Sequence, residues 1–203
     1  MATMPKQERA RVTRDSILAA AAQRFARDGY AHTSLADILE TAGVTKGAFY
    51  FHFDSKESVA EDVLAVYAEE VTIASERLRG EASAPLEALR LLCDQLVADE
   101  AHAHHLAIGF RLAAEAAALQ PGIAMPYYGA WLDAVGAPLR EAAASGDLPR
   151  DVEPDELARL VVTTLAGIGL VSSPLGDHDE RDRLVQLMWR LILPDTVSLP
   201  RTR

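Results

Sequence analysis

Residues 33–58 read TSLADILETAGVTKGAFYFHFDSKES, which contains two short helical segments around a glycine-containing turn. Ser34 followed by Asp37 is typical of a capping box, which begins a helix, and Gly43 is typical of a helix end. Thr45 can cap a second helix over residues 46–52, which is about two turns long. Two such helices behind a longer amphipathic helix are the pattern of a helix-turn-helix, in which the second helix faces outward.

Helical periodicity continues on both sides of this stretch. Apolar residues recur at spacings of three and four over residues 9–27, and again from Ser55 to about Arg79. Five further segments show the same pattern: 85–99, 102–118, 126–145, 154–171 and 180–193. No segment alternates apolar and polar residues as a strand does. The sequence therefore predicts an all-α protein of about nine helices.

Composition is ordinary for a globular protein. The chain has 203 residues, of which 49% are hydrophobic and 25% charged. No apolar run approaches the roughly 20 residues that cross a bilayer, and no secretory signal is evident near the first residues. The single cysteine, Cys93, cannot form an internal disulfide. We expect a cytoplasmic protein without a membrane partner.

Charge is unevenly distributed. The net charge of −10 argues against a nucleic-acid partner for the chain as a whole, since a polyanion is bound by neutralising its phosphates. Residues 1–58, however, hold eight basic and seven acidic residues, whereas residues 59–203 hold twelve and 23. All three lysines fall in the first segment. This asymmetry is what an N-terminal module that meets an anion would show, although chance clustering explains it equally well.

Catalytic and cofactor motifs are absent from the sequence. It contains no GxSxG, HExxH, P-loop or Cys/His nucleophile motif, so we do not expect an enzyme. His102 and His105 have helical metal-ligand spacing, but no cysteine or carboxylate constellation completes a site, and we expect no metal. Gly167 and Gly169 partly mimic a dinucleotide loop within a helix, where small residues instead permit close packing, and we expect no cofactor.

The stretch 33–58 closely resembles the DNA-binding signature of the TetR family of transcriptional repressors. Within the family, KGAFYFHF at 46–53 followed by Ser-Lys-Glu at 55–57 is most similar to the γ-butyrolactone receptor subgroup. The similarity is tight over residues 9–60 and looser after residue 85. It implies a helix-turn-helix DNA-binding domain over residues 1–56 and a helical ligand-binding and dimerisation domain over residues 57–203.

The resemblance assigns DNA contacts to seven residues. A helix start that bears Thr45 and Lys46 offers N–H groups, a hydroxyl and a cation, and Gly47 permits close backbone approach. Lys46 is expected to read a base in the major groove. Phosphate contacts are expected from Thr33, Thr45, Tyr50, His52 and Lys56.

Packing on the first helix is the alternative for Tyr50 and His52. We expect Phe49, Phe51 and Phe53 to supply the apolar side of their helix, which leaves Tyr50 and His52 for DNA.

The resemblance also implies an effector cavity. Trp131 is expected to line it, although a large aromatic residue in an all-α domain also simply fills the core. Thr164 is expected to supply a polar group, unless its hydroxyl bonds to the preceding helical turn. Phe110 is a further candidate. The subgroup's effectors are small and largely apolar: γ-butyrolactones, butenolides or furans.

Residues 154–171 and 180–193 are expected to build a four-helix bundle in a homodimer. A two-fold dimer predicts a pseudo-palindromic double-stranded operator with half-sites about one helical turn apart or slightly more. The chain is therefore interpreted as a repressor that releases DNA on binding its effector. The alternative is a pseudo-receptor of the same family, which answers to an antibiotic, a biosynthetic intermediate or no small ligand.

Overall fold

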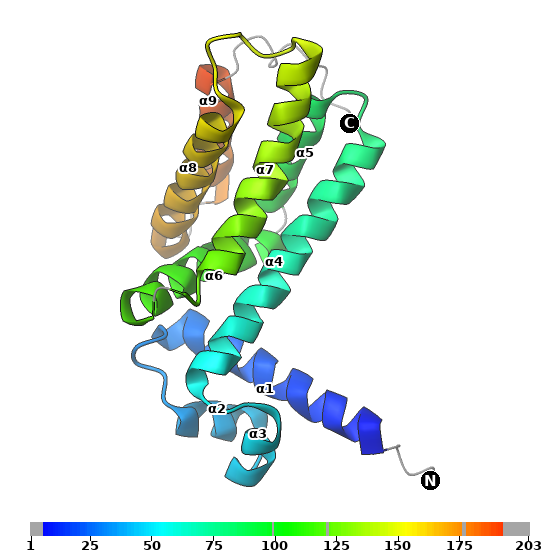
Figure 1. The fold of residues 1–203 in the computed structure, drawn as a ribbon. Helices are drawn as coiled ribbons and strands as arrows, with labels where there is room; N and C mark the ends of the chain where they lie inside the picture. The colour runs from blue at the N-terminus through cyan, green and yellow to red at the C-terminus, as the bar shows by residue number, and fades with distance from the viewer. Residues whose placement is uncertain (1–5, 99, 121, 176–177, 193–203) are drawn as a thin grey trace. The chain divides into compact units, whose positions relative to one another are not determined.

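The computed structural model describes residues 6–98, 100–120, 122–175 and 178–192, with side chains at 7–95, 106–120, 122–171 and 180–192. Every regular element in these ranges is an α-helix, which confirms the all-α prediction (Figure 1). The described helices are α1 (Lys6–Asp28), α2 (Leu35–Ala42), α3 (Lys46–His52), α4 (Lys56–Glu81), α5 (Pro85–Ala98), α6 (Glu100–Leu119), α7 (Met125–Ser145), α8 (Pro154–Leu175) and α9 (His178–Ile192). None of the described helices is long and apolar enough to cross a membrane.

The chain forms two compact units. Unit 1 comprises Met1–Val66 and Arg111–Pro126, and unit 2 comprises Tyr67–Phe110 and Tyr127–Arg203. This division differs from a cut after residue 56, because α4 begins at Lys56 and continues unbroken through Val66. Helices α4 and α6 each contribute residues to both units.

The boundaries of α2 and α3 follow local hydrogen bonds. The Ser34 hydroxyl accepts from the Asp37 backbone N–H at 3.2 Å, and the Asp37 carboxylate accepts from the Ser34 N–H at 2.8 Å. Gly43 ends α2 in the left-handed conformation, at φ 66°, which glycine adopts without strain. The Thr45 hydroxyl accepts from the Ala48 N–H at 3.2 Å and caps α3. The predicted capping box and turn are therefore confirmed.

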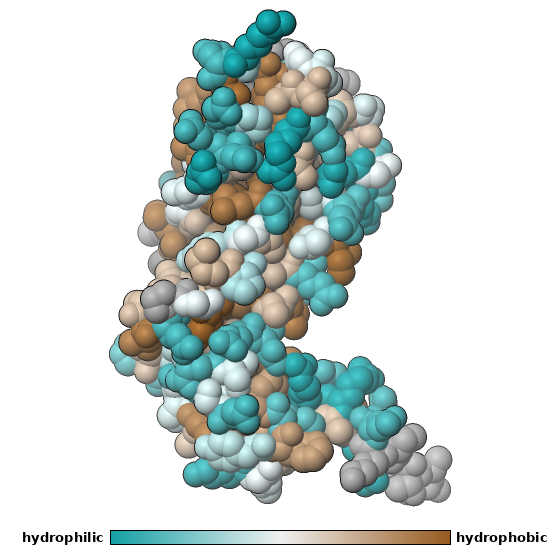
Figure 2. All heavy atoms as spheres, in the orientation of Figure 1, coloured by the Kyte–Doolittle hydropathy of each residue, from teal (hydrophilic) through white to brown (hydrophobic). Residues whose placement is uncertain are grey.

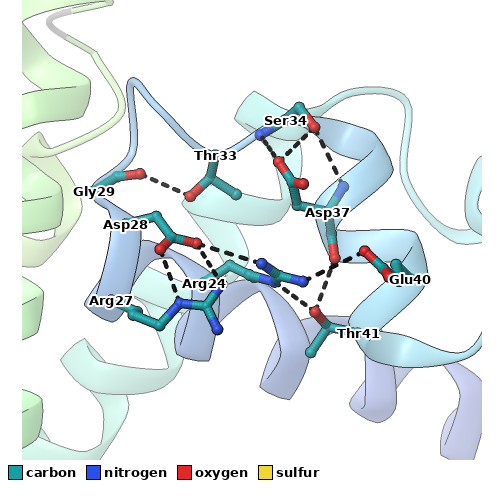
Figure 3. A network of polar contacts seen from close by, with 9 residues as sticks. All are labelled: Arg24, Arg27, Asp28, Gly29, Thr33, Ser34, Asp37, Glu40 and Thr41. Atoms are coloured by element: carbon teal, nitrogen blue, oxygen red, sulfur yellow. Dashed lines mark hydrogen bonds and ion pairs between the residues drawn. The ribbon is translucent and has the colours of Figure 1, made fainter.

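A polar network holds α2 on α1 (Figure 3). The Arg24 Nε donates to the Thr41 hydroxyl at 2.6 Å, and its guanidinium pairs with Asp28 at 3.5 Å and Glu40 at 3.7 Å. Ile17 and Phe25 of α1, Ile38 of α2 and Phe49 of α3 are all fully buried. The base on which α3 rests is thus both packed and hydrogen-bonded.

Unit 2 contains a proline inside helix α7. Pro138 has no N–H, so it cannot donate to the Ala134 carbonyl one turn earlier. The buried Ser75 hydroxyl of α4 donates to that carbonyl at 3.1 Å. Ser75 therefore satisfies a backbone group that the helix itself leaves without a partner, and joins α4 to α7.

Small residues bring α6 and α8 close together. A methyl group added at Gly169 would lie 3.5 Å from the Ala107 Cα, so the two backbones approach closely there. That distance is an ordinary van der Waals contact, so Gly169 lies in the packed interface but the space there does not require a glycine. Gly167, in contrast, has open space where its Cβ would lie.

Candidate functional site

Helix α3 presents one face outward. Thr45, Lys46 and Gly47 are exposed at its start, while Phe49 is fully buried and Phe53, which follows the helix, is almost so. Tyr50 is 48% exposed. Phe49 and Phe53, four residues apart, anchor the buried side of α3, and Lys46 and Tyr50, also four apart, lie on an exposed strip next to it.

The exposed face combines a cation, an aromatic ring and bare backbone. The Lys46 Nζ lies 5.8 Å from the centroid of the Tyr50 ring. No heavy atom lies within 4 Å of the position that a Gly47 Cβ would occupy, so the fold itself does not require a glycine there. This face can approach another molecule closely and offer it a positive charge.

Phe51 does not occupy the apolar side of α3 as predicted. It is 72% exposed, and its ring meets the half-buried His52 edge to face, with centroids 4.9 Å apart. The prediction was wrong because Phe51 follows Phe49 by two residues, which places the two side chains on nearly opposite faces of a helix.

Thr33 and Lys56 stabilise the turn between α1 and α2. Thr33 is 1% exposed, and its hydroxyl donates to the Gly29 carbonyl at 2.7 Å. The Lys56 Nζ donates to the carbonyls of Tyr30 and Thr33 at 2.9 and 3.0 Å, and lies 4.3 Å from the Tyr30 ring centroid. These contacts give both residues a role in holding the turn inside unit 1. The phosphate contacts expected of them stay a prediction.

The same turn is held from α6 by two residues that sequence reasoning missed. The Glu115 carboxylate accepts from the Tyr30 N–H at 2.5 Å. Arg111 donates to the carbonyls of Phe25 and Ala26 in the last turn of α1; the Phe25 carbonyl also accepts from the Gly29 N–H at 3.1 Å. No local signal in the sequence could have found these contacts, because they join residues 85 and 86 positions apart.

Four aromatic side chains meet in unit 2. The Phe110 ring centroid lies 5.2 Å from that of Trp131, 5.3 Å from Tyr127 and 6.1 Å from Tyr128. Phe110 and Trp131 are each only 2% exposed. The structure therefore brings two of the three predicted ligand residues together, within an aromatic cluster defined here as Phe110, Tyr127, Tyr128 and Trp131.

The aromatic cluster contains buried polar groups, and a buried polar group without a hydrogen bond costs free energy. The Trp131 indole N–H is buried without a hydrogen-bond partner. Burial raises the pKa of Tyr127 well above its usual value, and the Trp131 indole near its hydroxyl lowers it by a smaller amount. Gly109 makes room for the Tyr127 hydroxyl, which a side chain there would overlap. An unpaired N–H in an aromatic environment is a group that a ligand oxygen can satisfy.

The Thr164 hydroxyl bonds to the preceding helical turn, which was the alternative to a ligand contact. Its hydroxyl donates to the Leu160 carbonyl one turn earlier, at 2.8 Å. The hydroxyl is thus satisfied within α8, which removes the reason to assign it to a ligand. Leu160, four residues before it, is 53% exposed.

Apolar side chains are exposed along both C-terminal helices. On α8 they follow the spacing of one broad face, and on α9 they lie four residues apart: Leu160, Leu170, Val171, Leu187 and Leu191. Hydrophobic residues also reach the visible surface among hydrophilic ones in Figure 2. We call these five residues the α8–α9 apolar stripe.

Metal and thiol chemistry find little support in the described part of the chain. The side chains of His102 and His105 lie outside the described residues, and no group of three potential metal ligands occurs among the side chains that are described. Cys93 is buried, and burial raises the pKa of its thiol far above the usual value, which keeps it protonated and unreactive.

Comparison with known proteins identifies the family to which the chain belongs. Residues 17–63 match the bacterial regulatory proteins of the tetR family, and residues 83–198 match the tetracyclin repressor-like C-terminal domain. The chain belongs to the TetR family. The N-terminal match spans the helix-turn-helix, and the C-terminal match contains the aromatic cluster and the α8–α9 apolar stripe.

Similarity over most of this chain relates it to particular members of the TetR family. The A-factor receptor protein of Streptomyces griseus is 35% identical over 192 residues, which are 94% of this chain and 66% of that protein. A crystal structure of a gamma-butyrolactone receptor (ArpA-like protein) is 31% identical with a TM-score of 0.73, covering 91% of this chain and 87% of the other.

A third relative comes from a structure described as the molecular basis for control of antibiotic production by bacterial hormones. It is 33% identical with a TM-score of 0.73, covering 89% of this chain and 95% of the other. The chain is thus a TetR-family protein related to gamma-butyrolactone receptors, as the motif at residues 46–57 predicted.

Proposed function

We propose that this TetR-family chain is a homodimeric transcriptional repressor, not an enzyme, which releases its operator on binding a small γ-butyrolactone-like effector. The observation that carries the proposal is the exposed face of α3, where Lys46 and the bare backbone of Gly47 project from a helix-turn-helix fixed by buried contacts. A rigid base with an outward cationic helix is what major-groove recognition requires.

Within this proposal the residues of α3 and its cap make two kinds of DNA contact, to a base and to phosphates. Lys46 reaches a base edge, where lysine recognises the acceptors of guanine. Thr45, Tyr50 and His52 contact the phosphate backbone from the same helix. Thr33 and Lys56 also hold the turn that positions α2 and α3.

The aromatic cluster is the proposed effector site. Phe110 and Trp131 supply apolar walls, and the unpaired Trp131 N–H can donate to the carbonyl oxygen of a lactone or butenolide. The relatives described as A-factor and gamma-butyrolactone receptors support this effector class. The internally satisfied Thr164 removes one expected polar contact, and therefore favours the second candidate: a pseudo-receptor with another ligand or none.

The α8–α9 apolar stripe is the proposed dimer surface. Exposed apolar rows on two neighbouring helices are buried when a second copy adds two helices to form a bundle. A two-fold dimer would present two α3 helices to a pseudo-palindromic operator. An effector that binds better to a state with a different separation of those helices would release the DNA. Helix α4, which runs unbroken from Lys56 to Glu81, is the proposed connection.

A gel-shift titration tests the proposal. The purified protein is bound to the intergenic DNA upstream of its own gene and then challenged with butyrolactones, butenolides and furans. Release by one class supports the receptor, and binding that none of them disturbs supports the pseudo-receptor. Lys46→Ala is expected to weaken specific binding by about 1–3 kcal/mol for a lost base contact while leaving the fold intact. Full binding by Lys46→Ala would contradict the assigned role of Lys46.

A further inference from the structure

Phe51 is left without a role by the functions assigned so far. An isolated exposed apolar residue needs no explanation, so the location of Phe51 matters more than its exposure of 72%. It lies on α3 directly after Tyr50 and four residues after Gly47. Phe51 therefore belongs to the face that is proposed to meet DNA.

The surroundings of Phe51 form an apolar surface on that face. Side chains in a helix lean toward its N-terminus, so the Phe51 ring leans toward the turn that carries Gly47. Gly47 has open space where its Cβ would lie, so a second molecule can approach the helix backbone one turn before Phe51. Lys46 lies five residues before Phe51 on the same helix, above the Tyr50 ring. A polar contact and an apolar contact are thus both available on the exposed surface of α3.

We propose that Phe51 recognises the C5-methyl group of a thymine in the operator. This inference rests on the proposed DNA-binding function and extends it to a second determinant of sequence preference. A phenylalanine ring has no donor or acceptor for the polar base edges. Among the four bases, thymine alone presents a methyl group in the major groove, and apolar side chains recognise it by contact.

The proposal predicts the composition of the operator. Lys46 favours guanine acceptors, and Phe51, five residues further along α3, favours thymine within the same half-site. A protein partner could also cover Phe51, but it would compete with DNA for the exposed face of α3. The experiment below distinguishes the two.

The test uses the full chain and duplexes selected from a random library. Each thymine of the best selected duplex is replaced in turn by deoxyuridine, which removes only the methyl group. Loss of one buried methyl corresponds to about a fourfold loss of affinity. We expect this loss at one thymine of each half-site for the unmodified protein and no such loss for Phe51→Ala, which leaves the buried core untouched.

Two further variants serve as controls. Phe51→Leu keeps an apolar side chain and is expected to retain part of the discrimination between thymine and deoxyuridine. Val66→Ala removes another exposed apolar group of unit 1, on α4, and is expected to behave as the unmodified protein does. Thermal melts of all variants check that the fold is unchanged.

Each remaining outcome overturns a defined statement. Equal losses for the unmodified protein and Phe51→Ala, or no loss at any thymine, overturn the role of Phe51 while the proposed repressor stands. Failure of the unmodified protein to select any sequence overturns the proposed function itself. DNA affinity that is unchanged in Phe51→Ala on every duplex also overturns the inference, and indicates another partner for this side chain.

Discussion

Helix α3 of unit 1 and the aromatic cluster of unit 2 use aromatic side chains in opposite ways. Around α3, two aromatic side chains are buried and two face outward, and the described capping groups are satisfied by neighbours within four residues. In the aromatic cluster, Phe110 and Trp131 are almost fully buried, and one indole N–H is left unpaired. The exposed face of α3 is thus set largely by local contacts, whereas the aromatic cluster depends on packing between distant parts of the chain.

The largest expected contrast is between a buried and an exposed phenylalanine. Phe110→Ala removes a fully packed ring and is expected to lower the free energy of unfolding by about 3–5 kcal/mol. Phe51→Ala is expected to change it by no more than about 0.5 kcal/mol. Urea denaturation followed by circular dichroism measures both. Comparable losses for the two variants would show that the placement of Phe51 is wrong.

A second contrast concerns two buried hydroxyl groups. Ser75→Ala leaves the Ala134 carbonyl without its donor, since Pro138 cannot supply one, and is expected to cost about 1–3 kcal/mol of stability. Thr33→Val should cost less, because the Gly29 carbonyl also accepts from the Thr33 backbone N–H at 3.2 Å.

Pro138→Ala provides the control for Ser75, because it returns an N–H to α7. In that background Ser75→Ala should be markedly less harmful, and denaturation of the single and double variants measures the coupling. Strictly additive losses would show that Ser75 does not act through this carbonyl.

The proposed effector contact can be tested without disturbing the aromatic packing. Trp131→Phe keeps a ring but removes the unpaired N–H, so it is expected to weaken the response to a lactone by about 0.5–1.5 kcal/mol. Operator affinity without effector should stay the same. Fluorescence anisotropy of labelled operator, titrated with effector, measures both quantities, and an unchanged effector midpoint would sink the proposed hydrogen bond.

The smallest expected effect comes from a substitution in α3 that should raise stability and weaken DNA binding. Gly47→Ala has room for its methyl group and is expected to stabilise the protein by about 0.5–1 kcal/mol, because alanine favours the helix. The same methyl should weaken operator binding, since it occupies the backbone approach that the proposal assigns to DNA. Thermal unfolding and gel shifts together test this pair of effects, and higher stability with unchanged binding would contradict it.

Local chemistry in the sequence was sufficient for much of the fold. Ser34, Asp37 and Thr45 predicted the starts of α2 and α3, and Gly43 predicted the end of α2, because each acts on backbone groups within a few residues. The helical periods also predicted the all-α architecture. The aromatic partners Phe110 and Trp131 were found through family resemblance, since periodicity alone could not distinguish a ligand wall from ordinary core.

Tertiary structure decided which polar groups remain available. Thr33 and Lys56 carry side chains suited to phosphate, yet they are engaged in the turn after α1, and Phe51 is exposed rather than buried. The carbonyl that Ser75 satisfies lies 59 residues away along the chain. A sequence shows which groups each residue carries, but only the folded chain brings distant donors and acceptors within bonding distance, and burial then determines whether a group binds its own chain or another molecule.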